Sequence, residues 1–413
     1  MSGKRHYAGG PVARYLLLGS TAFLLLFGLV MVYSASSVSD LVNFSDGAYH
    51  FKRQLLFMVA GLVCMGLARL YDYRKLRSLS WPLYAVSITG LVAVLLIGVG
   101  RWGATRWLDV GGFTIQPSEF AKLACIMVVS LLLCDLSARK IDRRDFWGRL
   151  FVSVGIVLGL VMLQPDMGTA MSIAVAVYLV LVLGRIEWPI LGGTLVAGAA
   201  VAAGAIAIAP YRAARFLAFV NPWADPQGGG YQSIQAMLAF GSGGIAGVGL
   251  GMSRQKFFYL PAAHTDFIFA IIGEELGLLG TLAIVVAFAV FAYAGMRIAL
   301  GARDAFGRLL AGGLTVMVVT QALMNMAAVT GLMPVTGITM PLVSYGGSSL
   351  TFKMLCVGVI LSVSTYGMRG VRAVADRPIA KEPARARIGE RRGNRRPHLS
   401  RVGGRSSSAR RRA

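Results

Sequence analysis

Long runs of apolar residues recur along the chain, separated by shorter polar connections. Each run approaches the length of about 20 residues that a helix needs to cross the hydrocarbon core of a bilayer. The runs cover residues 15–36, 53–70, 80–100, 119–135, 150–164, 168–184, 188–209, 267–298, 309–330 and 343–367. Because a backbone in hydrocarbon must satisfy its own hydrogen bonds, these runs are predicted to be helices. The pattern predicts an all-α polytopic membrane protein with about ten transmembrane helices.

The composition agrees with this pattern. Hydrophobic residues make up 56% and charged residues 14% of the 413 positions, whereas ordinary globular chains are roughly 45–50% apolar. A soluble domain could not cover so much apolar surface, which excludes a soluble enzyme. The first apolar run is longer than the roughly 7–15 residues of a signal peptide. We therefore expect an uncleaved first helix, preceded by a cytoplasmic N-terminus at residues 1–14.

Basic residues gather in alternate connections, at 69–77, 139–149 and 297–308, and in both termini. The positive-inside rule makes the face that carries them cytoplasmic. The sequence therefore predicts a multi-pass plasma-membrane protein with both termini in the cytoplasm. The net charge of +23 is explained by this retention and does not indicate nucleic acid as a partner. Residues 369–413, basic and poor in apolar residues, are predicted to be a disordered cytoplasmic tail. Its partner is left open between anionic membrane lipid, a cytoplasmic division protein and nothing specific.

The opposite face receives the longer connections, at 37–52, 101–118, 210–266 and 331–342. The largest of them is the extracytoplasmic loop at about 210–266, between the seventh and eighth helices. Loops beyond about 15 residues are usually functional or disordered. Its apolar and Gly-rich stretches predict a loop that packs on the protein.

Charged residues within membrane segments are costly and are functional candidates by default. Glu119 and Lys122 stand three positions apart, so they share one helix face and can pair. The pair either holds two helices together or lines a polar cavity. Just before it, Arg106 and Trp107 suit an anionic lipid-linked ligand at the membrane surface. An aromatic anchor beside a snorkelling arginine is the alternative interpretation.

The densest polar region follows the long loop. Asp266 lies where the loop enters the eighth helix, as a functional carboxylate or as a helix cap. His264 is either functional or merely an interfacial polar residue, and Glu274 and Glu275 lie two turns deeper, where a carboxylate needs a partner or a proton.

The connection between the ninth and tenth helices is dense in Gly and Pro, and this composition continues through Ser344 at the start of the tenth run. Lys353 lies about a turn beyond its end. Such a composition predicts a broken backbone against protein or water, although glycine also serves plain helix packing.

Five motifs follow one another along the membrane region, and together they are highly specific. They are GATRW, QPSEFAK, QPDMGTA, HTDFIFAIIGEELG and PVTGITMPLVSYGGSS, which begin at residues 103, 116, 164, 264 and 334. With these motifs the membrane domain, residues 15–368, resembles the SEDS proteins (shape, elongation, division and sporulation) of bacterial cell-wall synthesis. The stretches LVMVYSASS and FKRQL, together with KFFYLPAAHTDFIFAIIGEE, resemble the division members more than the elongation members, while PVTGI leans the other way.

The resemblance implies a peptidoglycan glycosyltransferase that polymerises lipid II and releases undecaprenyl diphosphate. The family's essential outer-loop carboxylate falls on Asp266, which is expected to be catalytic. Residues expected to contact substrate are Arg106, Trp107, Glu119, Lys122, Arg215, Lys256, Glu275, Ser344 and Lys353. The sequence leaves open a divalent cation, Mg or Mn, between Asp266 and the diphosphate.

The resemblance further implies a class B penicillin-binding protein and other division proteins as partners, with enrichment at the septum. A lipid II flippase remains an alternative, because transporters also have buried charges and broken helices. A non-catalytic scaffold of the division machinery is a third candidate.

Overall fold

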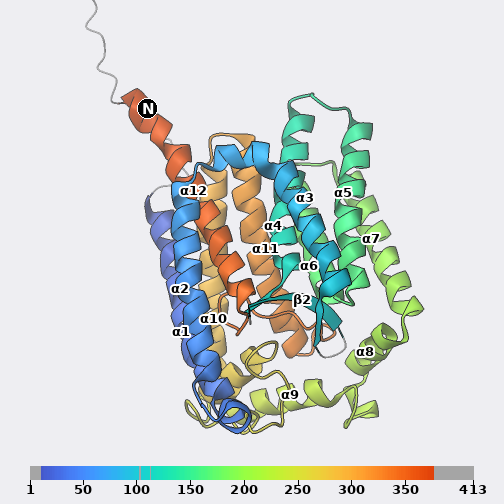
Figure 1. Cartoon of the computed structure of the whole chain (residues 1–413), viewed down its shortest axis with the longest axis vertical. Helices are drawn as coiled ribbons and strands as arrows, with labels where there is room; N and C mark the ends of the chain where they lie inside the picture. The colour runs from blue at the N-terminus through green and yellow to red at the C-terminus, as the bar shows by residue number, and fades with distance from the viewer. Residues whose placement is uncertain (1–10, 102–103, 112, 376–413) are drawn as a thin grey trace, which may run out of the picture. The chain divides into compact units, whose positions relative to one another are not determined.

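The computed structural model describes residues 11–101, 104–111 and 113–375. Most of the expected N-terminal segment therefore lies outside the described residues, as does the expected tail from residue 376 onward. All ten predicted segments are helices (Figure 1). In chain order they are α1 (Pro11–Phe44), α2 (Tyr49–Leu70), α3 (Tyr73–Ile97), α4 (Pro117–Ser137), α5 (Arg143–Leu163), α6 (Met167–Leu183), α7 (Trp188–Ile208), α10 (Ile268–Leu300), α11 (Ala305–Val329) and α12 (Ser348–Ala375).

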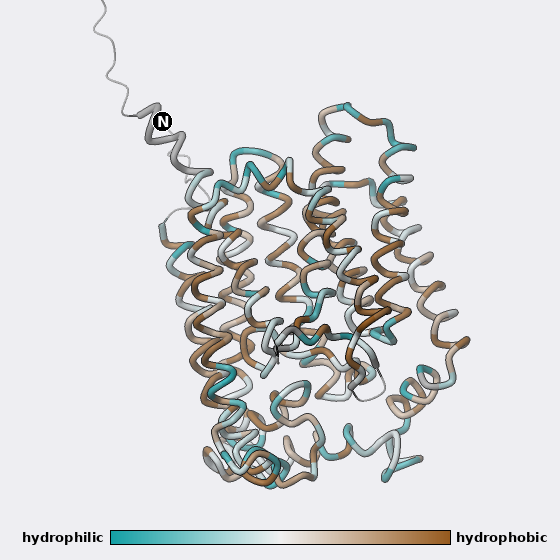
Figure 2. Tube along the Cα trace, viewed as in Figure 1, coloured by the Kyte–Doolittle hydropathy of each residue, from teal (hydrophilic) through white to brown (hydrophobic). Residues whose placement is uncertain are grey.

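Within the described part of the chain, nine of these helices are long and apolar enough to cross a membrane. The remaining one, α6, is apolar but has only 17 residues. Figure 2 shows apolar residues along the middle of the helices and polar residues gathered toward their two ends. This distribution matches a hydrocarbon layer between two aqueous surfaces, and the prediction of a polytopic helical membrane protein is confirmed.

The helices differ in how far the protein itself covers them. The apolar windows of α4 and α11 are 72% and 78% buried, whereas those of α2 and α7 are 11% and 6% buried. Figure 1 accordingly shows α4 and α11 in the interior of the bundle and α7 at its rim. Most residues on α4 and α11 are therefore surrounded by protein, which makes these two helices suited to holding polar groups.

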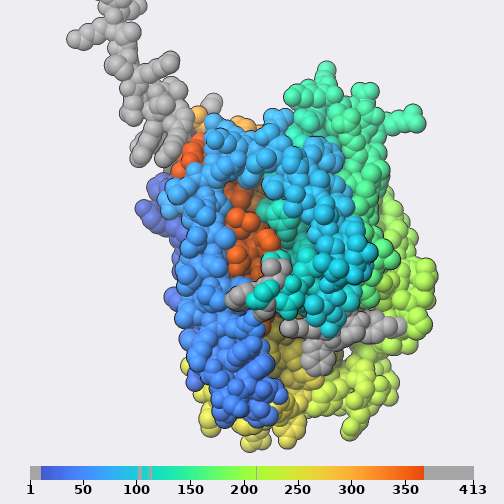
Figure 3. Space-filling view, in the orientation of Figure 1, coloured from blue at the N-terminus to red at the C-terminus, as the bar shows by residue number. Residues whose placement is uncertain are grey.

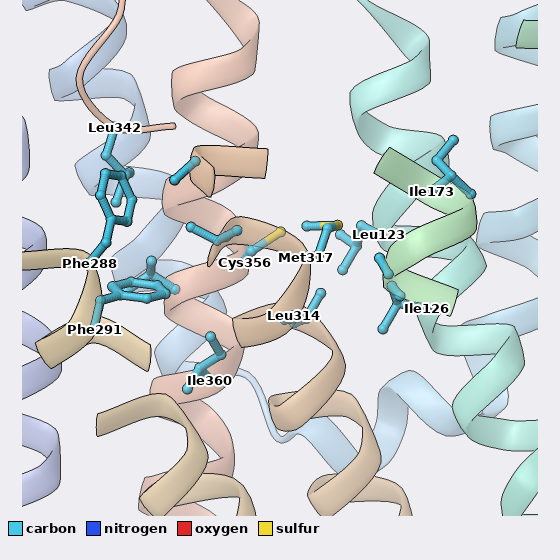
Figure 4. Packing of buried hydrophobic residues seen from close by; sticks show 14 of the residues in the cluster. Leu123, Ile126, Ile173, Phe288, Phe291, Leu314, Met317, Leu342, Cys356 and Ile360 are labelled. Carbon is cyan, nitrogen blue, oxygen red and sulfur yellow. The ribbon is translucent and has the colours of Figure 1, made fainter. Parts of the chain in front are cut away.

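The core lies where α4, α6, α10, α11 and α12 meet. In Figure 4, Phe288 and Phe291 of α10 face α12, and Leu314 and Met317 of α11 lie between α12 and α4. The labelled side chains belong to one continuous cluster of buried apolar residues. Such packing fixes the helices that carry the buried polar residues described below.

Glycines allow α2 and α12 to pack closely. A Cβ at Gly61 of α2 would stand 2.4 Å from Sδ of Met354, and one at Gly358 of α12 would stand 2.5 Å from the carbonyl oxygen of Met65. Small residues at such crossings let two backbones approach in a membrane. Atoms of α12 are visible between α2 and α3 in the space-filling view (Figure 3).

One end of the bundle, here called the loop end, carries the connections 45–48, 98–116, 164–166, 209–267 and 330–347. Two helices lie within the largest of these, α8 (Pro210–Val220) and α9 (Tyr231–Gly243), with a short 3₁₀ turn at Pro222–Ala224 between them. The prediction that this loop packs on the protein is confirmed for α9, since a Cβ at Gly243 would stand 1.9 Å from the carbonyl oxygen of Gly273 in α10.

The loop end also holds a small antiparallel sheet that the hydrophobic pattern did not predict. Its strands are β1 (Val99–Arg101), β2 (Ala104–Val110) and β3 (Phe113–Ile115), in the order β1-β2-β3. Trp107 of β2 pairs with Val99, and Leu108 pairs with Ile115. The register with β1 passes from Thr105 to Trp107, so Arg106 lies at the irregularity in this pairing.

Helix α10 is broken at Gly277, which has φ +63° and ψ −155°. The long loop supplies hydrogen bonds on both sides of this break. Val248 and Gly249 donate their backbone N–H groups to the carbonyls of Glu274 and Glu275, each at 3.0 Å. Beyond the break, Leu278 donates to the carbonyl of Gly244 at 3.0 Å. The short first part of α10 and the loop therefore form one hydrogen-bonded unit.

Candidate functional site

Asp266 lies in the last turn of the long loop, two residues before the start of α10. The N-cap position of α10 is Phe267, so the interpretation of Asp266 as a helix cap is wrong. The side chain of Asp266 is half-buried, and its backbone carbonyl accepts a hydrogen bond of 2.7 Å from the side-chain amide of Asn325. The backbone that carries this carboxylate is thus anchored to α11.

Arg106 and Gly337 border the same small space as Asp266. A Cβ at Gly337 would stand 3.7 Å from Oδ2 of Asp266 and 3.8 Å from Nη1 of Arg106. Gly337 has φ +71°, a backbone conformation that glycine adopts at low cost. The absence of a side chain at residue 337 leaves room between a carboxylate and a guanidinium.

Arg106 is held in place by the hairpin between α5 and α6. Its Nη2 donates a hydrogen bond of 2.6 Å to the carbonyl of Pro165, and its Nη1 lies 3.7 Å from Oδ1 of Asp166. Asp166 in turn caps α6 by accepting from the backbone N–H of Thr169 at 3.1 Å. Its other oxygen, Oδ2, and Nε of Arg106 are buried without a hydrogen-bond partner among the residues that the structure describes. These atoms retain hydrogen-bonding capacity for a ligand or for water.

Arg215 approaches the site from α8. Its Nη1 donates to the carbonyl of Val335 at 3.3 Å, two residues from Gly337 in the connection between α11 and α12. The positive charges of Arg106 and Arg215 both act on Asp266. The predicted grouping of Asp266 with these two arginines is therefore present in the structure, from three separate elements.

The pKa of Asp266 is raised from its ordinary value to about 6. Loss of hydration on burial is the main cause, and Asp166 adds to it by repulsion, while Arg106 and Arg215 oppose it. A carboxyl group with this pKa exchanges a proton close to neutral pH, as a general base should.

Two buried amides on α11 hold the site together, and the sequence analysis did not identify them. Asn325 donates to the carbonyls of Asp266 and Ile338, each at 2.7 Å, and so ties the two loops to one helix. One turn earlier, Gln321 donates to the carbonyl of Thr339 at 3.1 Å. A polar side chain within a membrane helix is the signal that could have identified both.

Glu119 is the centre of a fully buried ion-pair network. Lys122 donates to Oε1 of Glu119 at 2.7 Å, and Lys353 of α12 pairs with Oε2. Lys122 also donates to Oε1 of Gln321 at 2.9 Å, and Gln321 contacts the loop at Thr339. The structure thus joins α4, α11 and α12 through these residues and places the network beneath the loop that borders Asp266. Every charge in it has a protein partner.

Glu274 and Glu275 hold residues 253–256 of the long loop. Glu275 accepts from Oγ of Ser34 at 2.7 Å and lies 3.8 Å from Nζ of Lys256, which also donates to the carbonyl of Gly251. Glu274 accepts from the hydroxyl of Ser253 and from the backbone N–H of Arg254. Lys256 therefore contacts Glu275 and its own loop, and Glu275 joins this loop to α1 through Ser34.

The remaining candidates have local partners. Ser344 is buried, and its hydroxyl accepts from the backbone N–H of Met340 at 2.9 Å within the connection before α12. Its carbonyl accepts from the side chain of Gln54 at 3.2 Å. Trp107 is half-buried on β2, next to Arg106. Among the described residues, no group of three or more His, Cys, Asp or Glu could hold a metal ion.

The chain is similar to known proteins over most of its length. A family model described as cell cycle protein, that of FtsW, RodA and SpoVE, matches residues 15–368. Stage V sporulation protein E of Bacillus subtilis (strain 168) is 44% identical over 358 residues, which cover 85% of this chain and 96% of that protein. A probable peptidoglycan glycosyltransferase FtsW of Trichlorobacter lovleyi is 45% identical over 356 residues, covering 84% and 92%.

The fold is also similar to that of solved structures. A chain from a peptidoglycan synthase complex, solved to explain the coordination of polymerization and crosslinking, matches with a TM-score of 0.72 and 28% identity. The match covers 86% of this chain and 98% of that chain. Relatives named FtsW span 38–45% identity, which supports the expectation of an FtsW-like member. The chain therefore belongs to the FtsW, RodA and SpoVE family of cell cycle proteins, the SEDS family that its motifs resemble.

Proposed function

We propose that this chain polymerises lipid II into glycan strands and that Asp266 is its catalytic carboxylate. Relatives that cover most of the chain at 38–45% identity are named peptidoglycan glycosyltransferases, and this chain is an enzyme of that kind. The observation that carries the assignment of the site is the meeting of Asp266 with Arg106 beside Gly337, where no side chain fills the space between the two charges.

The proposed reaction is a glycosyl transfer. A sugar hydroxyl of one lipid II attacks the anomeric carbon of the growing chain, and the bond from that carbon to undecaprenyl diphosphate breaks. Asp266 takes the proton of the attacking hydroxyl, which its pKa of about 6 permits at neutral pH. The electron pair of the broken bond leaves with the diphosphate.

Arg106 and Arg215 suit the leaving diphosphate. Both are cations next to Asp266, and guanidinium groups match phosphate oxygens in shape and charge. Arg106 is already oriented by Pro165 and Asp166, so it need not reorganise as charge develops on the leaving group. Trp107 beside it suits the boundary between the lipid tail and water.

The expected topology puts this site on the outer surface of the plasma membrane. The loop end carries the site, while the Arg- and Lys-rich connections lie between the other helix ends. Under the positive-inside rule both termini are cytoplasmic. A class B penicillin-binding protein is the proposed partner, supported by the similarity to a chain of a peptidoglycan synthase complex that couples polymerization to crosslinking. Enrichment at the septum follows from the FtsW-like relationship.

The test is polymerisation of lipid II by the purified chain with its penicillin-binding partner. Wild type and Asp225→Asn should give polymer, whereas Asp266→Asn should give none. Asp225 is the matched control because it is an exposed carboxylate in the same long loop. Polymer from Asp266→Asn equal to that of wild type would remove Asp266 from the mechanism. Translocation of lipid II in vesicles without any polymer would favour the flippase, and normal division with Asp266→Asn would favour the scaffold.

A further inference from the structure

A second polar cluster lies beside the loop that carries Asp266, and the proposed reaction does not use it. It consists of four side chains from four parts of the chain: Asp40 near the end of α1, His50 in the first turn of α2, His264 in the long loop, and Tyr345 in the connection before α12.

Asp40 and His50 form the fixed base of this cluster. Asp40 is fully buried, and one of its oxygens accepts from Nδ1 of His50. Its other oxygen accepts from the backbone N–H of His50 and from the hydroxyl of Ser36, each at 2.9 Å. A carboxylate that accepts at Nδ1 sets which ring nitrogen carries the proton and holds the ring orientation. The His50 ring is therefore locked by its own backbone and by α1.

His264 and Tyr345 pack on this locked ring. The ring centroid of His50 lies 4.5 Å from that of His264 and 4.5 Å from that of Tyr345. The backbone N–H of Tyr345 donates to the carbonyl of His264 at 3.0 Å. Three rings at these separations are in direct packing contact, so one locked imidazole orients two loops at once.

The His264 ring is neutral at physiological pH. The pKa of His264 is lowered to about 4, chiefly by loss of hydration on burial and also by the neighbouring His50, while Asp40 opposes both effects. A neutral imidazole packs against its neighbours without the cost of a second buried charge. The contact between the two histidines is therefore stable at the pH where the enzyme would work.

We propose that Asp40 and His50 are positioning residues for Asp266, and we call the pair the Asp40–His50 clamp. His264 stands two residues before Asp266, and the backbone between them contains no regular helix. The clamp fixes one side of this short segment, and Asn325 fixes the other through the carbonyl of Asp266. Displacement of a catalytic group by about 1 Å can reduce a rate on the order of 100-fold. This inference rests on the proposed function only for its kinetic consequence.

The clamp itself can be tested without the reaction. Hydrogen exchange of backbone amides should quicken at least about tenfold at residues 262–267 and 344–347 in His50→Ala, with no change at residues 138–142 at the opposite end of the bundle. Asp46→Asn is the matched control, since it breaks an exposed pair with Lys52 in the same α1–α2 connection. Unchanged exchange at 262–267 in His50→Ala, or exchange that quickens equally at 138–142, would overturn the clamp.

The kinetic consequence is tested with lipid II and the penicillin-binding partner. His50→Ala should lower kcat at least about tenfold and leave KM within about twofold, because positioning acts on the catalytic carboxylate. The double variant His50→Ala/His264→Ala should be no slower than the slower of the two single variants, since each substitution removes the same contact between the two rings. Asp40→Asn should retain more activity than Asp40→Ala, because its amide oxygen still accepts from His50.

The outcomes separate the two proposals. Equal kcat in wild type and His50→Ala, with faster exchange at 262–267, would overturn the positioning role. Multiplicative losses in the double variant would also overturn it. No polymer from wild type would overturn the proposed function, and hydrogen exchange would still decide whether the clamp holds the loop.

Discussion

The side-chain amide of Asn325 holds the backbone carbonyl of Asp266 at 2.7 Å. The same amide nitrogen holds the carbonyl of Ile338 at the same distance. A single donor group on a buried helix thus sets the separation between the loop that carries Asp266 and the loop that contains Gly337. The spacing of the site depends on this amide.

Asn325→Asp is predicted to lose nearly all polymerase activity. The substitution keeps the shape of the side chain but places a carboxylate oxygen where the donor met two carbonyl oxygens. Loss of buried hydrogen bonds of this kind costs roughly 1–3 kcal/mol of folding free energy. Polymerisation assays and thermal unfolding in detergent check the prediction. Asn325→Asp with wild-type kcat would show that the amide does not set the site.

The rate of polymerisation is predicted to rise with pH and to reach half its maximum near pH 6. Asp266 must be ionised to accept a proton, and its pKa is raised to about 6 by burial and by Asp166. The initial rate measured from pH 5 to pH 8 checks this.

The pKa of Asp266 in the folded protein lies above its ordinary value. Its contribution to the free energy of unfolding is therefore fully present below about pH 4 and is lost as pH rises through 6. A rate independent of pH from 5 to 7 would contradict the assignment of Asp266 as base.

Arg106→Gln is predicted to move the midpoint of this pH profile upward. The positive charge of Arg106 lowers the pKa of Asp266, so its removal makes the carboxyl group harder to ionise. The maximal rate should also fall, because a cation facing the diphosphate is lost. The midpoint and the plateau are read from the same pH series. A fall in the plateau with an unmoved midpoint would mean that Arg106 does not act on Asp266.

Glu119→Ala is predicted to lower the free energy of unfolding by about 3–5 kcal/mol, because it leaves two buried ammonium groups without their carboxylate. These groups belong to Lys122 and Lys353, both about 1% exposed. The double variant Glu119→Ala/Lys353→Met should lose less free energy of unfolding, since it leaves only the ammonium group of Lys122 without its carboxylate. Unfolding in mixed micelles measures both. Lys52→Met, which breaks an exposed pair, serves as the control and should leave stability unchanged.

Gly337→Ala is predicted to lower activity more than stability alone explains. Its φ of +71° costs an alanine about 1–2 kcal/mol, and the added methyl would stand between Asp266 and Arg106. Gly111→Ala is the matched control: it has a similar φ of +61° but nothing within 4 Å of the added Cβ. Equal kcat in the two variants, each corrected for the folded fraction, would show that the space beside Gly337 is not used.

The membrane helices were predictable because their signal is local. Length and apolarity alone define a segment such as 188–209, which the structure shows as Trp188–Ile208. The pairing of Glu119 with Lys122 was predictable for the same reason, as the two stand three positions apart on one helix. Lys353 as the second partner of Glu119 was not, because 234 residues separate them and only the packing of α12 on α4 brings them together.

The small sheet and the support of the site were missed for a related physical reason. β1 and β3 have three residues each, too few for an alternating pattern to stand out. Asp166 lies in a hairpin whose sequence indicates a turn, and only the fold places it 3.7 Å from Arg106. Lys256 lies 3.8 Å from Glu275, a relationship that depends on how the long loop folds back, and the contact of both residues with substrate stays a prediction.

The break in α10 at Gly277 determines where the chain can accept foreign sequence. The carbonyls of Glu274 and Glu275 depend on the N–H groups of Val248 and Gly249, so an epitope inserted at 244–257 would leave them unsatisfied in a membrane. Residues 225–229 are exposed, and the turn there is closed by the side chain of Asp225 on Gly228 and Gly229. A reporter tag or fluorophore for following this protein in living cells therefore belongs at 225–229.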